Sequence, residues 1–146
     1  MNSANSQTQE AIRETIEAWT RAVRAKDIDA IMAHYAADCR DFDAVAQLQF
    51  RGREAYRTHW QACMEFCQGP HTFEPHELEI AAAEDLAFAH FLTRCGGTNE
   101  QGEQQSGWLR TTLCLRRIGG QWLIVHDHFS VPFDMKTGEL LFNLQP

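Results

Sequence analysis

Four extended stretches in the second half of the chain, each separated from the next by a short turn-like segment, restrict the fold more than any other feature. The stretches are HTFEPHELEIAAA, LAFAHFLTRC, QQSGWLRTTLCLRRI and QWLIVHDHFSV, and the segments between them are EDL, GGTNEQGE and GG. Gly119-Gly120 between two apolar stretches is typical of a β-hairpin turn. The pattern therefore predicts an antiparallel sheet after Pro70.

The first half of the chain has the periodicity of helices. Residues 8–26 place apolar side chains three and four positions apart, which predicts one amphipathic helix. These side chains are Ile12, Ile16, Trp19 and Val23. Asp27 has the position of an N-cap for a second, short helix, and a small hairpin that ends at Gly52 follows. We expect a third helix, closed by Gly69-Pro70. Its apolar face carries Tyr56, Trp60, Cys63 and Met64. Helices followed by an antiparallel sheet predict an α+β fold in which the helices cover one face of a curved sheet.

Composition restricts the class of protein. The length of 146 residues, with 44% hydrophobic and 23% charged residues, fits one globular domain spanning 1–146. The formal net charge of −7 argues against nucleic acid or an anionic membrane as a partner. The polar N-terminus lacks the apolar core of a secretory signal, and no apolar run approaches the roughly 18 residues of a membrane span. We therefore expect a cytoplasmic protein.

The cysteines and histidines raise the question of a metal site. Cys63 and Cys67 are four positions apart, a spacing that two buried small residues satisfy as well as two metal ligands. His126 and His128 are two positions apart and project the same way, but only His90 is a candidate third ligand. We therefore expect reduced thiols, no metal and no cofactor, and histidines that bond across strands or at a subunit contact.

Several motifs carry a resemblance to a known family. They are RAKDIDAIMAHYAADCRDFDA near the N-terminus, LQFRGREAY followed by Trp60, R-x-T at 110–112 and W-x-I-V-H-x-H-x-S-x-P at 122–132. In these motifs and in the order of its elements the chain resembles the nuclear transport factor 2-like superfamily, which includes ketosteroid isomerase and the SnoaL-like polyketide cyclases. The likeness extends over nearly the whole chain and is greatest to an uncharacterised SnoaL-like group of small bacterial proteins. It implies a cystatin-like cone, in which a curved antiparallel or mixed sheet and three helices enclose a pocket.

The same resemblance suggests positions for site residues. Ketosteroid isomerase combines an aspartate base with an oxyanion hole made of a tyrosine and a protonated aspartate. The base corresponds to Asp43, but the two oxyanion-hole positions correspond to Trp19 and Thr112. A further tyrosine of the third helix corresponds to Trp60. Steroid isomerisation by that mechanism is therefore not expected.

The pleat of the last strand separates its polar residues. One face carries Val125, Asp127 and Phe129, and the other carries Ile124, His126, His128 and Ser130. The resemblance assigns the first face to the cavity, together with Arg110, Thr112 and Cys114 of the preceding strand. The expected pocket contains the polar residues Asp43, Asp127, Arg110 and Thr112, with Trp19, Tyr35, Trp60 and Phe129 as its walls.

An arginine inside this pocket requires a carboxylate partner, because an unpaired buried charge is costly. If Arg110 pairs with Asp127, Asp43 can act as a base on a C–H bond next to a carbonyl, and Arg110 can stabilise an enolate or hold a substrate carboxylate. If Arg110 pairs with Asp43, the site is better suited to binding. In a third alternative, Arg110 and Asp127 only satisfy each other within the sheet.

Two hypotheses of function follow. The first is a ketosteroid isomerase-like or SnoaL-like enzyme that transfers a proton without a metal, with Asp43 as base, Arg110 as electrophile or anchor and Asp127 as orienting partner or second acid. It requires Asp43 and Arg110 to point into one closed cavity. The second is a non-catalytic ligand-binding or oligomerisation module, similar to the association domain of calcium/calmodulin-dependent protein kinase. The expected partners are a small organic molecule and a second copy of the chain, which forms a homodimer through the exposed sheet face.

Overall fold

The N-terminal half of the chain forms the expected helices in the computed structural model, which describes residues 3–146. The helices are α1 (Ser3–Arg24), α2 (Ile28–Met32) and α3 (Arg53–Phe66). The predicted apolar stripe of α1 is buried, and the Asp27 carboxylate caps α2 by accepting the Ala30 N–H at 3.1 Å. The first turns of α1 precede residue 8, where the sequence has no apolar periodicity that could indicate them.

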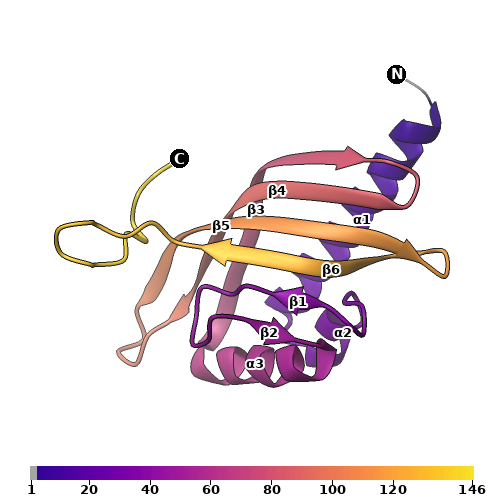
Figure 1. Cartoon of the computed structure of the whole chain (residues 1–146). Coiled ribbons are helices and arrows are strands. Elements are labelled where there is room, and N and C mark those ends of the chain that lie inside the picture. Colours follow the sequence, from indigo (N-terminus) through magenta and orange to yellow (C-terminus); the bar gives the residue numbers. More distant parts are fainter. Residues whose placement is uncertain (1–2) are drawn as a thin grey trace.

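The second half forms one antiparallel sheet (Figure 1). Its strands are β3 (Gln68–Ala82), β4 (Leu86–Thr98), β5 (Gln104–Ile118) and β6 (Gln121–Ser130), in the order β3-β4-β5-β6. Gly119 and Gly120 have φ angles of 58° and 80°, as a tight hairpin turn between β5 and β6 requires. Gly69 and Pro70 were expected to close the third helix, but they lie in β3, where an edge strand tolerates a proline.

A small hairpin delivers two aspartates to the edge of this sheet. It consists of β1 (Arg40–Asp41) and β2 (Phe50–Arg51), as predicted between the second and third helices. The chain after β1 runs parallel to β6, because the Phe42 N–H donates to the Asp127 carbonyl oxygen and the Phe129 N–H donates to the Phe42 carbonyl oxygen, both at 2.9 Å. The segment that contains Asp43 is therefore held beside Asp127.

The register of β6 contains one irregularity that decides which side chains face the core. Leu115 pairs with Ile124 and Cys114 pairs with His126, so Val125 is an extra residue in β6. Ile124 and Asp127 are consequently both buried, at 1% and 0% exposure. The predicted alternation is confirmed for Asp127 and for the residues that follow it, and it is wrong for Ile124, which faces the core.

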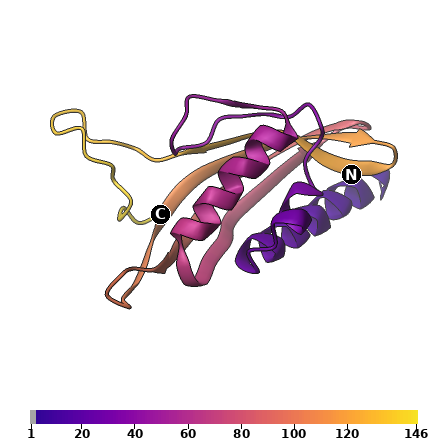
Figure 2. The ribbon, with the colours of Figure 1, turned by 90° about the horizontal axis from the view of Figure 1, so that it is seen from below.

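The core lies between the sheet and the helices α1 and α3, which cover the same face of the sheet (Figure 2). Aromatic rings occupy its centre: Trp19 lies 5.3 Å from Phe73 and 6.3 Å from Trp60, between ring centroids. The predicted fold class, α+β with N-terminal helices on a curved antiparallel sheet, is confirmed. Within residues 3–146, no helix has the length and apolarity needed to cross a membrane.

Candidate functional site

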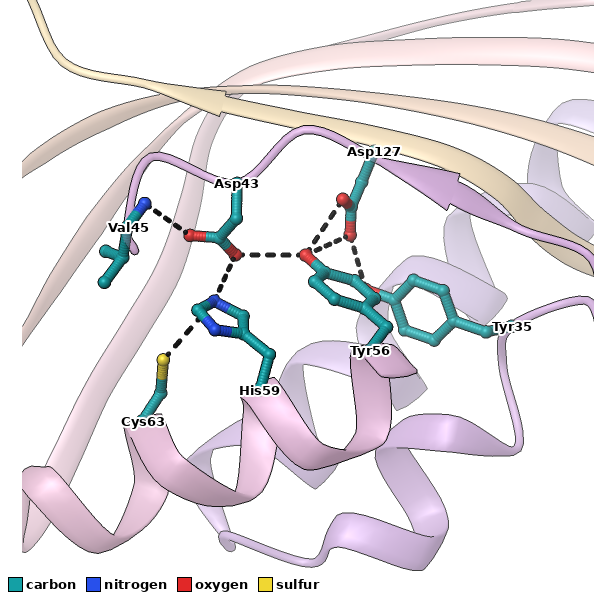
Figure 3. A network of polar contacts seen from close by, with 7 residues as sticks. All are labelled: Tyr35, Asp43, Val45, Tyr56, His59, Cys63 and Asp127. Atoms are coloured by element: carbon teal, nitrogen blue, oxygen red, sulfur yellow. Dashed lines mark hydrogen bonds and ion pairs between the residues drawn. The ribbon is translucent and has the colours of Figure 1, made fainter. Parts of the chain in front are cut away.

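The last strand buries an aspartate against two tyrosines (Figure 3). Asp127 is 0% exposed, and its carboxyl group contacts Tyr35 Oη at 2.6 Å and Tyr56 Oη at 2.9 and 3.0 Å. Burial, and then the nearby Asp41 charge, raises the pKa of Asp127 well above its ordinary value, while hydrogen bonds from the tyrosines oppose this only in part. The environment of Asp127 therefore favours a neutral, protonated carboxyl group.

The Tyr56 hydroxyl connects Asp127 to a second carboxyl group, that of Asp43. Tyr56 Oη lies 3.0 Å from Asp43 Oδ2 and 2.9 Å from Asp127 Oδ1. A hydroxyl has one proton to donate, so both contacts are hydrogen bonds only if one carboxyl group is itself protonated and donates to the tyrosine oxygen. Asp127 is the fully buried one, and we therefore assign the proton to it. Tyr56 then donates to Asp43.

Asp43 also pairs with a histidine one turn further along α3. His59 Nε2 lies 3.3 Å from Asp43 Oδ2, and the two side chains are 6% and 14% exposed. Burial by itself lowers the pKa of His59, but hydrogen bonds with Asp43 and Cys63 and the Asp43 charge outweigh it and raise the pKa to about 9. At neutral pH an imidazolium cation therefore stands beside the Asp43 carboxylate. The same nitrogen lies 3.6 Å from Cys63 Sγ.

The protein occupies three of the acceptor positions of the Asp43 carboxylate. Oδ2 faces Tyr56 and His59, and Oδ1 accepts the Val45 N–H at 3.1 Å. An ionised carboxylate has about four acceptor positions, so one position is left on Oδ1. It lies on the side of the exposed loop between β1 and β2, because Val45 belongs to that loop (Figure 3). A bound molecule can deliver a proton to Asp43 there.

A third aspartate lies beneath this network. Strand-like alternation in Asp41-Phe42-Asp43 points the two aspartates the same way, and Asp41 is 0% exposed. Asp41 Oδ1 accepts the Asp127 N–H at 3.1 Å, whereas Oδ2 has no hydrogen-bond partner among the described residues. Burial raises the pKa of Asp41, and hydrogen bonds with Cys39 and Asp127 oppose it. Asp41 and Asp127 thus form a buried pair of acids.

Arg110 lies on the opposite face of the sheet, so its predicted place in the pocket is wrong. The core side chains of β5 are Thr111, Leu113 and Leu115. With a period of two, Arg110 and Thr112 must face outward. Arg110 is exposed and its Nε donates to Ser130 Oγ at 3.0 Å, so it pairs with neither Asp127 nor Asp43. Thr112 is likewise not a lining residue of the internal site.

The other predicted site residues are brought together. Asp43, Asp127 and Tyr35 belong to the polar network, and the predicted walls Trp19, Trp60 and Phe129 pack next to it. The ring centroid of Trp60 is 5.9 Å from that of Tyr56 and 6.4 Å from that of Phe129. The aromatic core therefore supports the network directly through Tyr56.

His126 and His128 point to the outer face of the sheet, as their alternation predicts. Their rings contact the Phe42 ring edge-on, at centroid distances of 4.8 and 5.6 Å. His126 Nδ1 also contacts the Arg40 carbonyl oxygen, which confirms a hydrogen bond between strands. Across residues 3–146, no three histidine, cysteine or acidic side chains are grouped so that they could hold a metal ion.

Two hollows mark the surface of the molecule. A groove of about 430 Å³ crosses the outer sheet face, and Arg110, Thr112 and His128 contribute to its lining. An open cleft of about 1440 Å³ lies between the last turn of α3, the adjoining ends of β4 and β5, and Phe142. Neither hollow is lined by Asp43. Since Arg110 faces away from Asp43, the prediction of one closed cavity shared by the two residues is wrong.

Four residues of the network were not identified as site residues from the sequence: Tyr56, His59, Cys63 and Asp41. The first three are spaced three and four positions apart on α3 and so share one face of the helix. His59 is absent from the predicted apolar face because it is polar, although its spacing places it there. Asp41 is two positions before Asp43, which is sufficient to place both on one side of an extended segment.

Helices on one face of a curved antiparallel sheet, enclosing a buried cluster of acids and tyrosines, define a nuclear transport factor 2-like protein with an internal polar site. The chain belongs to the family of SnoaL-like domains, whose sequence model matches residues 12–134. No curated protein matches the chain.

Solved structures agree with this assignment. The chain is 48% identical to an NTF2-like protein of unknown function from Pseudomonas putida KT2440, with a TM-score of 0.87 over 99% of this chain and 97% of that one. An NTF2-like superfamily protein from Salmonella enterica serovar Typhimurium is 18% identical, with a TM-score of 0.78 over 92% and 97%. A ketosteroid isomerase-like protein from Erwinia carotovora atroseptica is 20% identical, with a TM-score of 0.71 over 83% and 93%. The last two likenesses show the fold alone.

Proposed function

We propose that this protein is an enzyme that transfers a proton next to a carbonyl group of a small organic molecule, as an isomerase or a lyase does. The observation that carries the proposal is the Asp43–His59 pair, a carboxylate and an imidazolium 3.3 Å apart at the edge of a buried polar network. A base and an acid in contact can remove a proton from carbon and stabilise or protonate the oxygen that gains charge.

Asp43 is the candidate base, because its cationic partner is a histidine, which unlike an arginine can lose its proton and leave the carboxylate without a cation. It keeps a free acceptor position on Oδ1, while Tyr56, His59 and the Val45 N–H fix the orientation of the carboxylate. This orientation matters because a general base must reach its proton at hydrogen-bond distance. Only 14% of the Asp43 side chain is exposed, so a substrate bound over it would have little water to displace from the carboxylate.

In this proposal His59 is the electrophile that stabilises the substrate oxygen, a role that was expected of Arg110. A pKa of about 9 keeps His59 protonated at neutral pH. Its Nε2 faces Asp43, so donation to an enolate oxygen or to a leaving hydroxyl group requires the Nε2–H to exchange Asp43 for the substrate. Unlike an arginine, a histidine can also give up the proton completely, which a dehydration requires.

Asp127 supports the pair from below. As a neutral acid it donates to Tyr56, and Tyr56 in turn donates to Asp43, so the buried end of the network does not compete with Asp43 for the negative charge. The Asp127 carboxyl group is hydrogen-bonded to Tyr35 and Tyr56, which makes it a rigid support rather than a place for substrate. The name of one structural relative, a ketosteroid isomerase-like protein, is compatible with this class of reaction.

The test is hydrogen exchange and turnover with two simple ketones. In deuterated buffer, NMR would follow the isomerisation of cyclohex-3-en-1-one and the dehydration of 4-hydroxybutan-2-one, with and without the protein. We expect acceleration by the wild type, loss of it in Asp43→Asn, and no change in Asp38→Asn, a matched exposed aspartate on the same segment. If both variants behave like the wild type, or if ketones bind without any exchange, the proposal is wrong and a non-catalytic binding module is the better description.

We also propose a homodimer through the outer sheet face. The support for this is the composition of that face, on which Phe88 remains 49% exposed beside the groove lined by His90 and His128. Light scattering at several protein concentrations would show a mass of two chains, and a concentration-independent single-chain mass would contradict it.

A further inference from the structure

A thiol lies at the open end of the network, in contact with the acid–base pair. Cys63 follows His59 by one turn of α3, and its Sγ is 3.6 Å from the imidazole Nε2 that also contacts Asp43 (Figure 3). The carboxylate and the thiol therefore both face the same nitrogen of one imidazole. A cationic imidazole next to a thiol favours the thiolate, which is the nucleophilic form of cysteine.

The cleft begins one turn beyond Cys63. Cys67 lines the cleft together with Cys95 of β4, whereas Cys63 is not among its lining residues. Cys63 itself is half-buried, so it is neither sealed in the core nor freely solvated.

The neighbouring thiols lack the features that activate Cys63. Cys67, the C-cap residue of α3, is also half-buried, but burial and then the Cys63 charge raise its pKa, while Lys26 opposes this. Burial, followed by the charges of Cys67 and Asp43, raises the pKa of Cys95 to about 12. Among the described residues, neither thiol is hydrogen-bonded to an imidazole as Cys63 is to His59. Cys67 is thus a natural internal control for Cys63.

We propose that Cys63 is a nucleophilic residue, activated by His59 and Asp43, that adds to the β-carbon of small α,β-unsaturated carbonyl compounds. The inference uses the acid–base pair of the proposed function and names conjugated enones as the ligand class of the same site. It does not require that any substrate turns over.

The addition is balanced without a further reactant. The thiolate electron pair forms the C–S bond, the carbon–carbon π bond breaks, and its electrons move to the carbonyl oxygen as an enolate. The thiol proton leaves to solvent, the protonated His59 donates a proton at the α-carbon, and His59 then regains a proton from solvent. The adduct contains all atoms of the thiol and the enone, and the reverse steps release both unchanged.

The experiment treats the purified full-length chain with cyclohex-2-en-1-one at pH 7.5 and follows adducts by intact-protein and peptide mass spectrometry. We expect Cys63 to react roughly tenfold faster than Cys67, because only Cys63 has a cationic imidazole beside it. Cys63→Ser should remove the fast adduct. His59→Gln should lower the rate at Cys63 to about that of Cys67 and leave the rate at Cys67 unchanged.

Equal rates at Cys63 and Cys67, or an unchanged Cys63 rate in His59→Gln, would overturn the inference. If circular dichroism shows that His59→Gln does not fold, Asp43→Asn replaces it, since loss of the Asp43 charge removes what keeps His59 protonated. The two proposals fail separately. Ketone exchange without a fast Cys63 adduct refutes only the thiol inference, and a fast adduct without exchange refutes only the proposed enzyme.

Discussion

Asparagine in place of Asp127 tests whether this carboxyl group is neutral in the folded protein. Asp127 is 0% exposed and its carboxyl group contacts the hydroxyl groups of Tyr35 and Tyr56. An asparagine has the same shape without a charge: its oxygen can accept from Tyr35 while its amide donates to the Tyr56 oxygen, as a protonated carboxyl group does. We therefore expect Asp127→Asn to fold with hydrogen bonds of the same direction.

The magnitude follows from proton linkage. A folded-state pKa above the unfolded value, about 3.9 for aspartate, gives stability that is fully present below the unfolded pKa and is lost as pH rises through the folded pKa. For one proton the slope is about 1.4 kcal/mol per pH unit within that window. Asp127→Asn has no such proton. Relative to the wild type, its free energy of unfolding should therefore increase by up to about 2.7 kcal/mol from pH 5 to pH 7.

Urea unfolding followed by tryptophan fluorescence at pH 5, 6 and 7 measures this difference. Asp41→Asn is the matched variant, because Asp41 is also 0% exposed and its pKa is also raised. The variant whose free energy of unfolding no longer falls between pH 5 and pH 7 identifies the carboxyl group that holds the proton. A difference between wild type and Asp127→Asn that stays constant from pH 5 to 7 would mean that Asp127 is ionised. The proton assignment at Tyr56 would then be refuted.

Three further predictions concern the rest of the molecule. Arg110→Ala should leave the rate of Asp43-dependent turnover within about twofold of the wild type, because Arg110 lies on the outer sheet face, away from Asp43. A larger loss of rate in the ketone assay would place Arg110 in the site. Thr93→Val should lower the free energy of unfolding in urea by about 1–3 kcal/mol, because it leaves the buried Thr111 hydroxyl, 2.7 Å away, without its partner. Adding Thr111→Val should restore part of this stability. An additive loss in the double variant would contradict this. The turnover rate should fall as pH rises through about 9, because His59 keeps its proton only below that pH. His59→Gln should not show this fall in rate. If it does, the fall belongs to the titration of another group.

Most of the fold could be predicted from the sequence, because the signals are local. The apolar stripe of α1 and the glycine pair at the β5–β6 turn each depend on a few neighbouring residues. The end of α3 could not be placed, since Gly69-Pro70 is compatible with a helix end and with an edge strand alike. Only the pairing with β4 decides between the two.

The candidate site was predicted in part, and its errors have two different causes. Arg110 and Thr112 were placed by resemblance, whereas the apolar residues at 113 and 115 already indicated the opposite phase for β5. The position of Ile124 could not be obtained in this way, because the extra residue at Val125 is a property of the pairing between two strands and leaves no mark in either one alone.

The extra residue in β6 also explains where the charge of the network lies. It brings Asp127 to the core face next to Tyr35 and Tyr56, where burial favours the protonated acid. If Asp127 carries the proton that burial favours, the hydrogen bonds have one direction: Tyr35 donates to Asp127, Asp127 to Tyr56, and Tyr56 to Asp43. Asp43 is the last acceptor in this series, and it is the carboxyl group that combines partial exposure with a cationic partner. The Asp43 carboxylate therefore lies beside His59 at the partly exposed end of the network, where the proposed function requires it.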